Sequence, residues 1–146
     1  MSMAMGKEER EAFLRGLHVG VIGVVEEEGR APLLVPVWYD VTDDGEVFFL
    51  TQSTSRKAKA IARAGRFSLC VQDESTPYKY VAVEGSVTGV TPSDNERDLR
   101  PMARRYLGEE GGDDYVASVA GGDADDAVIR MRPEHWVSAD YGKQGG

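Results

Sequence analysis

Residues 51–83 read TQSTSRKAKAIARAGRFSLCVQDESTPYKYVAV and decide the fold, because they join a strand end, a polar turn, a short basic helix and two further strands. Candidate N-cap residues stand at 53–55 and Gly65 stands where a C-terminal cap belongs, which predicts a helix of about ten residues. Its narrow apolar stripe at helical spacing consists of Ala58, Ile61 and Ala62. We interpret this stretch as a cradle that holds an anionic cofactor.

The first turn of this helix carries charges that a helix start disfavours. Free backbone N–H groups concentrate positive charge there and favour Asp or Glu, yet the turn carries Arg56 and Lys57, with Lys59 close behind. An anion bound at the helix start would make these charges favourable. The alternative is a basic helix face that meets only solvent, because such charge preferences amount to about 0.3–1 kcal/mol per residue.

Short strands with hairpin turns make up most of the remaining chain. We expect strands at residues 19–25, 33–40, 46–51, 67–72 and about 79–90, and a last bent strand at 128–131 and 135–139 that Pro133 interrupts. Residues 47–50 are expected to be buried on both sides, and Gly85 and Gly89 to bend the long strand. Pro36 donates no ladder hydrogen bond, so it belongs on an edge strand or at a bulge.

Two further helices are expected. One covers residues 8–17, and the other runs from Ser93, which Glu96 follows at capping-box spacing, to Gly108. Residues 109–126 are acidic and glycine-rich, and we expect them to be the most mobile or variable part, with one short helical candidate at 115–119.

These elements predict a mainly β fold of six or seven antiparallel strands with short covering helices, a small barrel or sandwich. At 146 residues the chain suits a single domain over 1–146, with frayed ends at 1–7 and 142–146.

The composition excludes several classes of partner. A net charge of −8 provides no long-range field that attracts nucleic acid or anionic lipid. The single cysteine, Cys70, excludes an internal disulfide, fits a reducing cytoplasm, and lies in an apolar alternation that predicts its burial. No apolar run approaches the ~18 residues of a membrane span, and the start lacks a signal peptide. We therefore expect a cytoplasmic protein.

No catalytic or metal motif is present. A G-x-G-x-x-G fingerprint, a Walker loop and a zinc-ligand cluster are all missing, so no metal site is predicted. His18 and His135 have no acidic or serine partner at motif spacing, and no protein side chain is predicted to be catalytic. The chemistry of such an enzyme would be carried by a cofactor.

The ordered segments over residues 8–92 resemble a known superfamily. They read VGVIGVV, PVWYD, DGEVFFLT, the S-R-K turn and helix, RFSLCV and PYKYVAVEG. This set resembles the split β-barrel superfamily of flavin- and deazaflavin-binding proteins related to pyridoxamine 5′-phosphate oxidase, and more narrowly the actinobacterial branch that uses coenzyme F420. The resemblance implies a homodimer whose cofactor lies in a groove between subunits.

The resemblance also implies which residues bind the cofactor. The phosphate would be held at the loop and helix start by Thr51, Ser53, Ser55, Arg56, Lys57 and Lys59, with Lys57 matching the family lysine most directly. The ring would lie along Pro36, Val37 and Trp38, with a second wall from Pro77, Tyr78, Lys79 and Tyr80. Two departures concern this site, since Ser55 stands where related sequences often have arginine and Ala60 where an asparagine is common.

The choice of cofactor depends on the strand APLLVPVWYD. FMN sites of the family add an arginine and a lysine there, and this strand has no basic residue, which favours F420 over FMN. A basic track of Lys59, Arg63, Arg66 and Lys79 would suit the polyglutamate tail of F420, although these charges can equally face solvent.

The resulting functional hypothesis is an F420H2-dependent reductase that transfers a hydride to an electron-poor double bond of a small hydrophobic organic substrate. Trp38, Tyr78, Tyr80 and Trp136 of the second subunit would shape the pocket by apolar contact. One alternative is an FMN-binding oxidoreductase of the same fold. Another is a non-catalytic protein that binds F420, flavin or heme, with His135 as the heme ligand.

Overall fold

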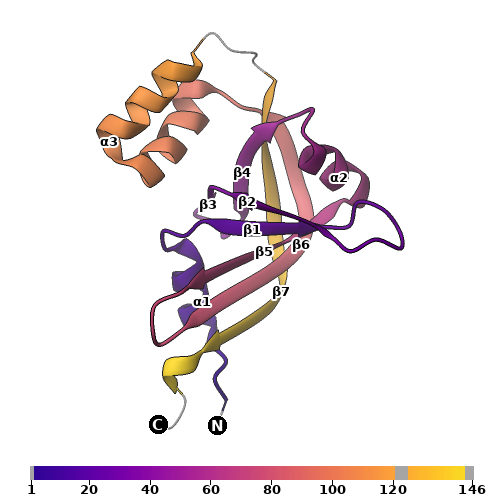
Figure 1. Cartoon of the computed structure of the whole chain (residues 1–146), viewed down its shortest axis with the longest axis vertical. Coiled ribbons are helices and arrows are strands. Elements are labelled where there is room, and N and C mark those ends of the chain that lie inside the picture. The colour runs from indigo at the N-terminus through magenta and orange to yellow at the C-terminus, as the bar shows by residue number, and fades with distance from the viewer. Residues whose placement is uncertain (1, 121–124, 144–146) are drawn as a thin grey trace.

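A computed structural model describes residues 2–120 and 125–143 of the chain (Figure 1). Seven antiparallel strands form one sheet in the order β2-β1-β5-β6-β7-β4-β3. The strands are β1 (Gly20–Val24), β2 (Leu33–Val37), β3 (Tyr39–Val41), β4 (Val47–Gln52), β5 (Arg66–Asp73), β6 (Lys79–Pro92) and β7 (Asp126–Asp140). The helices are α1 (Lys7–Arg15), α2 (Arg56–Ala64) and α3 (Arg100–Val119), with short helical turns at Asn95–Leu99 and Tyr141–Lys143. The predicted mainly β antiparallel fold is confirmed.

Trp38 closes the sheet on itself. The strand predicted at 33–40 is two strands, because β2 pairs with β1 while β3 pairs with β4, and only Trp38 separates them. These two strands are the opposite edges of the sheet. Since residues two apart in a chain lie within about 7 Å, the sheet must curl until its edges meet at Trp38. Pro36 lies on the edge strand β2, as expected.

The core fills the inside of the curled sheet. Alternate side chains of β4 are fully buried at Val47 and Phe49, whereas Phe48 and Leu50 are only half-buried, so the prediction that residues 47–50 are buried on both sides is wrong. One face of β4 packs into the core and the other is partly exposed to solvent, as in a curled antiparallel sheet. The Phe49 and Phe67 rings meet edge to face with centroids 5.5 Å apart.

The two long strands, β6 and β7, bend together where the sequence has glycines. Their register shifts between Glu84 and Gly85 and again between Val87 and Gly89. A Cβ on Gly85 would lie 1.7 Å from the carbonyl oxygen of Arg132, so only glycine allows this backbone approach. Pro133 pairs opposite Gly85 inside β7, and the predicted interruption of this strand is therefore a bulge in a continuous strand.

The helix α3 extends well beyond its predicted end. Gly108 has φ 80° and ψ 172° and kinks the helix, after which residues 109–119 continue as a second limb. The helix predicted at 115–119 is present but is longer than expected, because it begins at residue 109, and residues 121–124 of the segment lie outside the described part. The cap before α3 is Asp94 and not Ser93, since the Asp94 carboxylate accepts hydrogen bonds from the N–H groups of Glu96 and Arg97.

Two predictions of burial are also wrong. Cys70 is exposed, because the other face of β5 carries the buried residues Phe67, Leu69 and Val71. Ala62 of α2 is exposed and Ala60 is buried in its place.

The N-terminal residues lie beside the end of β7. The N–H of Asp140 donates to the carbonyl oxygen of Met3, and the N–H of Met5 donates to Ser138 Oγ at 3.0 Å. The predicted fraying at the extreme ends falls partly on Met1 and residues 144–146, which lie outside the described residues. Within residues 2–120 and 125–143, no helix combines the length and apolar character needed to cross a lipid bilayer.

Candidate functional site

The start of α2 is built from hydroxyl groups, as the sequence predicts. Ser55 caps the helix by accepting a hydrogen bond from the N–H of Ala58 at 3.2 Å, and its Oγ lies 3.0 Å from Oγ1 of the buried Thr51. In an α-helix the first N–H groups have no intrahelical acceptor, which here leaves those of Arg56 and Lys57 directed outward from the helix start. Hydroxyl and amide donors therefore gather where β4 passes into α2.

Three of the four basic residues of this helix lie near its start and differ in their surroundings. Lys57 is half-buried, and removal from solvent lowers the pKa of its ammonium group. Arg56 is 66% exposed and forms an ion pair with Glu26 in the β1–β2 turn. Lys59 and Ser53 are exposed. Within the described part of the chain, Lys57 is thus the one of these three that lines a cavity, while Arg56 is paired with Glu26.

Lys57 stands at the junction of two adjoining cavities of about 850 and 430 Å³, which share Leu50, Lys57, Tyr115 and Asp126. We call their union the Lys57 cleft. Its first half is polar, lined by Thr51, Gln52, Ser55, Ser93, Asp94 and Ser118 among others. Its second half is mainly apolar, lined by Val19, Pro36, Val37, Trp38, Leu99 and Met102. The structure therefore brings the predicted residues at 36–38 together with Thr51, Ser55 and Lys57.

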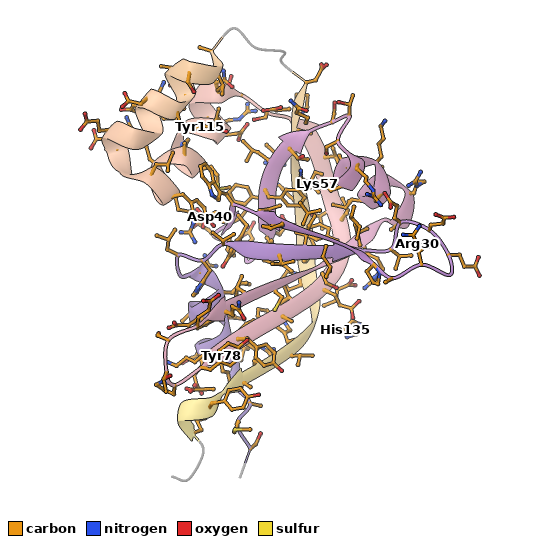
Figure 2. All side chains as sticks on the ribbon, viewed as in Figure 1. Arg30, Asp40, Lys57, Tyr78, Tyr115 and His135 are labelled. Atoms are coloured by element: carbon orange, nitrogen blue, oxygen red, sulfur yellow. The ribbon has the colours of Figure 1, made fainter. Side chains whose placement is uncertain are left out.

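The kinked helix α3 covers the apolar half of the cleft. From its first limb, Tyr106 stacks on Trp38 with ring centroids 5.0 Å apart and planes 6° apart. From its second limb, Tyr115 approaches the same indole at 5.6 Å. Figure 2 shows Tyr115 on α3 and Lys57 at the same end of the sheet, opposite the end that carries Tyr78. The cleft is thus closed on one side by a helical hairpin.

Sequence reasoning missed the residues that α3 and the following strand contribute. These are Met102, Tyr106, Tyr115 and Asp126. Tyr115 and Asp126 lie in the acidic, glycine-rich segment, whose composition hid the second limb of α3, whereas Met102 and Tyr106 lie in the helix that the sequence predicted and were not recognised as cleft residues. A tyrosine followed nine residues later by another tyrosine, with Gly108 between them, is the one pattern that hints at two limbs facing a common target.

Comparison with models of known protein families shows which family the chain belongs to. A model of the family described as pyridoxamine 5′-phosphate oxidase matches residues 7–139. The chain belongs to the pyridoxamine 5′-phosphate oxidase family. The superfamily resemblance seen in the sequence is therefore confirmed. No curated protein matches the chain.

Solved structures with the pyridoxamine 5′-phosphate oxidase fold include several similar chains. A conserved hypothetical protein from Mycobacterium tuberculosis is 23% identical, with a TM-score of 0.79 over 99% of this chain and 91% of that one. A protein named F420 reductase is 21% identical, with a TM-score of 0.69 over 87% and 94%. A FAD-binding protein from Mesorhizobium loti is 17% identical, with a TM-score of 0.65 over 92% and 93%. At these identities the likeness shows the fold.

The second wall implied by family resemblance lies elsewhere in the chain. Pro77, Tyr78, Lys79 and Tyr80 are at the far end of the sheet from Lys57, where Figure 2 shows Tyr78. The Tyr78 hydroxyl donates to Gln72 Oε1 at 2.7 Å, and its ring lies 6.2 Å from Tyr80 and 5.6 Å from Tyr141. Within one chain these aromatic residues form a cluster of their own, separate from the Lys57 cleft.

Trp136 and the two histidines also lie outside this cleft. Trp136 stands under Arg10 of α1, with the guanidinium carbon 4.6 Å from the ring centroid. His18 Nε2 donates to the carbonyl oxygen of Phe13 at 3.0 Å, and its ring stacks on Phe13. His135 is exposed on β7.

The outer face of the sheet carries an apolar row that crosses five strands. The pairing registers align Pro36, Val21, Cys70, Ala82 and Val137 side by side. We call these five residues the exposed row. Val137 is 60% exposed, and the neighbouring Leu34 is 68% exposed. An apolar band of this kind on a sheet face is typical of a protein–protein interface.

The donor set of the Lys57 cleft fits a cofactor of the family. Hydroxyl groups, outward backbone N–H groups at a helix start and one ammonium group are the donors that proteins use for phosphate. The apolar half beside them has the indole of Trp38 for a flat ring. The carboxylates of Asp94 and Asp126 in the polar half would repel an anion, so the Lys57 ammonium group is needed to offset their charge.

Proposed function

We propose that the chain is an F420H2-dependent reductase of a small hydrophobic organic substrate, with F420 bound in the Lys57 cleft. The observation that carries the proposal is the division of this cleft into a polar and an apolar half, with Lys57 between them. A phosphate joined to a flat ring system has the same division. The fold shared with a protein named F420 reductase supports the choice of deazaflavin.

The residues of the cleft would bind the cofactor, orient its ring and exclude water. Ser55 and Thr51 would donate hydrogen bonds to phosphate oxygens, and Lys57 would neutralise their charge. Trp38 would fix the plane of the ring, while α3 would keep water from it. Bound F420H2 supplies a hydride from C5 of its deazaflavin ring to an electron-poor double bond. No protein nucleophile is required, and the proton comes from solvent or a tyrosine.

We further propose that the working protein is a cytoplasmic homodimer. The exposed row is apolar over five strands, and a second copy packed on it would remove it from water. Pro36 belongs both to this row and to the Lys57 cleft, so the interface and the cleft adjoin. A partner chain could thereby bring its Tyr78–Tyr80 cluster to the cofactor as the second wall.

FMN is the second candidate cofactor. Membership of the pyridoxamine 5′-phosphate oxidase family and the FAD-binding protein of the same fold support a flavin. Against it stands the sequence of β2, LLVPV, which offers no basic side chain.

Separate fluorescence-quenching titrations with F420 and FMN test the proposal. We expect tighter binding of F420, and a loss of affinity of about tenfold or more in Lys57→Ala, because one charged contact contributes about 1.5–3 kcal/mol. Lys7→Ala is the matched control, since Lys7 lies on α1 outside the cleft. Equal F420 affinity in Lys57→Ala and wild type would refute the site. Tighter binding of FMN than of F420 would make FMN the cofactor in place of F420.

A further inference from the structure

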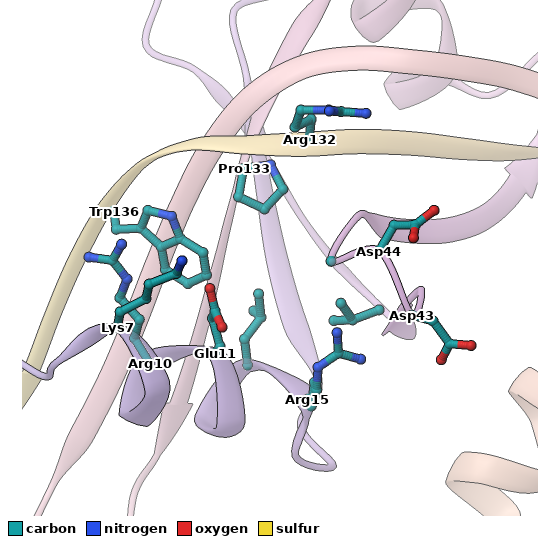
Figure 3. Close-up of a pocket in the computed structure, with 12 residues that line it drawn as sticks. Lys7, Arg10, Glu11, Arg15, Asp43, Asp44, Arg132, Pro133 and Trp136 are labelled. Atoms are coloured by element: carbon teal, nitrogen blue, oxygen red, sulfur yellow. The ribbon is translucent and has the colours of Figure 1, made fainter.

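A second cavity lies beside α1 and the middle of β7, away from the Lys57 cleft. It has a volume of about 380 Å³ and is lined by α1, the turn between β3 and β4, and β7 (Figure 3). Small-molecule sites in proteins start at about 300 Å³. No residue lines both this cavity and the Lys57 cleft. The cavity is therefore a candidate site that the proposed reductase function does not use.

Arg10 is held in position at one end of this cavity. Its guanidinium lies over the Trp136 ring at 4.6 Å from the centroid, and Figure 3 shows the two side chains together. Its Nε is buried and meets no hydrogen-bond acceptor among the described residues. Stacking on an indole restricts the long side chain, so the planar fork of the guanidinium is oriented before any ligand arrives.

The cations at this end have no carboxylate partner. Within residues 2–120 and 125–143, neither Arg10 nor Lys7 forms an ion pair, although ten such pairs are found elsewhere in that part of the chain. The Glu11 carboxylate also lines this cavity from α1, but no ion pair joins it to Lys7 or Arg10 within the described residues. A bound anion would supply the missing partner.

The wall next to Arg10 is apolar and flat. It combines the Trp136 indole and the Pro133 ring from β7 with Leu14 from α1, whose side chain is only 2% exposed. These surfaces suit a planar ring more than a flexible polar chain. The charged side chains that line the cavity are four cations, Lys7, Arg10, Arg15 and Arg132, and three carboxylates, Glu11, Asp43 and Asp44. This surplus of one positive charge suits a ligand with one negative charge and disfavours ligands that carry several.

We propose that this cavity binds a small planar monocarboxylate. Its carboxylate would accept hydrogen bonds from the Arg10 guanidinium beside the Lys7 ammonium, and its ring would lie against Trp136 and Pro133. Trp136 faces this cavity while the adjacent Val137 belongs to the exposed row, so the site stays open when a second copy covers that row. The ligand class follows from one oriented guanidinium, one flat apolar wall and a lining with a surplus of one positive charge.

Benzoate is the probe for a titration followed by tryptophan fluorescence. The chain has two tryptophans, so a Trp38→Phe background leaves Trp136 as the reporter. We expect saturable quenching by benzoate and at least tenfold weaker binding in Arg10→Gln. Arg30→Gln is the control, because Arg30 is an exposed arginine in the β1–β2 turn, far from the cavity (Figure 2). Circular dichroism and thermal unfolding would check that each variant is folded.

Two companion ligands separate the parts of the proposal. Acetate keeps the carboxylate without the ring, and benzylamine keeps the ring with the opposite charge, so both should bind at least tenfold more weakly than benzoate. Absence of saturable quenching in the folded wild type would overturn the site. Equal losses in Arg10→Gln and Arg30→Gln, or benzylamine binding as tightly as benzoate, would overturn the role of Arg10. Acetate binding as tightly as benzoate would overturn the planar wall.

Discussion

Tyr106 and Trp38 stack with ring planes only 6° apart, and this contact joins α3 to the residue where the sheet closes. The Tyr106 hydroxyl also accepts from the N–H of Tyr39 at 3.0 Å and donates to the carbonyl oxygen of His18 at 2.6 Å. Arg105 adds hydrogen bonds to the carbonyl oxygens of Tyr39 and Gly16. The helical cover of the Lys57 cleft is thus fixed to the backbone on both sides of the closure.

Replacing Tyr106 by phenylalanine should destabilise the protein while preserving the stacking on Trp38. The N–H of the fully buried Tyr39 would lose the hydroxyl acceptor, and an unsatisfied buried group costs about 1–3 kcal/mol. Urea unfolding measures the change. Tyr115→Phe is the control, because the Tyr115 hydroxyl has no hydrogen bond within the described residues, and its stability should stay within about 0.5 kcal/mol of wild type. Equal stability of both variants would contradict the role assigned to the Tyr106 hydroxyl.

Gly108→Ala should destabilise the kink of α3. Gly108 has φ 80° and ψ 172°, a backbone region that is essentially restricted to glycine, and a side chain there costs about 1–3 kcal/mol. Gly89→Ala provides the comparison, since a Cβ on Gly89 meets nothing within 4 Å and its φ is ordinary. The free energy of unfolding from urea titrations separates the two. A loss no larger than that of Gly89→Ala would mean that the kink adapts to a side chain.

Local patterns predicted the elements whose signals are complete within a few residues. The cap at Ser55, the Gly65 terminus of α2 and the bend at Gly85 all depend on the chemistry of one or two residues, and the structure has them in place. Residues 36–38 and Lys57, which family resemblance assigns to the cofactor, line one cleft, and their role in binding stays a prediction. Their meeting in one cleft required the folded sheet.

Features that depend on distant partners could not be predicted in this way. Residues 33–40 have one uninterrupted strand pattern, and the division at Trp38 arises only because two different strands, β1 and β4, pair with its halves. Cys70 alternates with apolar neighbours, yet its face of β5 is the outer one. The second limb of α3 is held by Arg100 and Arg104, which both bind Asp113 across the kink.

The acid stability of the protein should depend on Asp113. Hydrogen bonds from Arg104 and then Arg100 lower the pKa of its carboxyl group from 3.8 to about 2. Because the folded pKa is depressed, the carboxylate stabilises the fold above its unfolded pKa, and this contribution is lost as the pH falls from about 4 to about 2. Wild type should therefore unfold at a higher urea concentration than Asp113→Asn above about pH 4, and this difference in urea midpoint should shrink as the pH falls to about 2. For Asp114→Asn, which alters an exposed neighbouring carboxylate, no such narrowing is expected.

The exposed row should govern self-association. Val137→Glu places a charge on a side chain that is 60% exposed and that a second copy would bury, so the variant should shift toward monomer in analytical ultracentrifugation. Leu107→Glu changes another exposed leucine, 45% exposed and located on α3, and should leave the association state of wild type unchanged. A wild-type chain that is monomeric at all concentrations, or a Val137→Glu variant that associates as wild type does, would exclude this face.

Asp126 should weaken the binding of an anionic cofactor in the Lys57 cleft. It lines both halves of the cleft together with Lys57, and it is partly exposed at the start of β7. In a solvated site, one charge at about 4 Å contributes about 1 kcal/mol, so Asp126→Asn should tighten F420 binding by a factor of about five. The gain should shrink at high salt, because screening weakens a repulsion between exposed charges. Asp114→Asn removes a carboxylate of α3 outside the cleft and should leave the affinity unchanged. Weaker F420 binding in Asp126→Asn, measured by the same fluorescence titration, would show that this carboxylate holds the ligand and does not repel it.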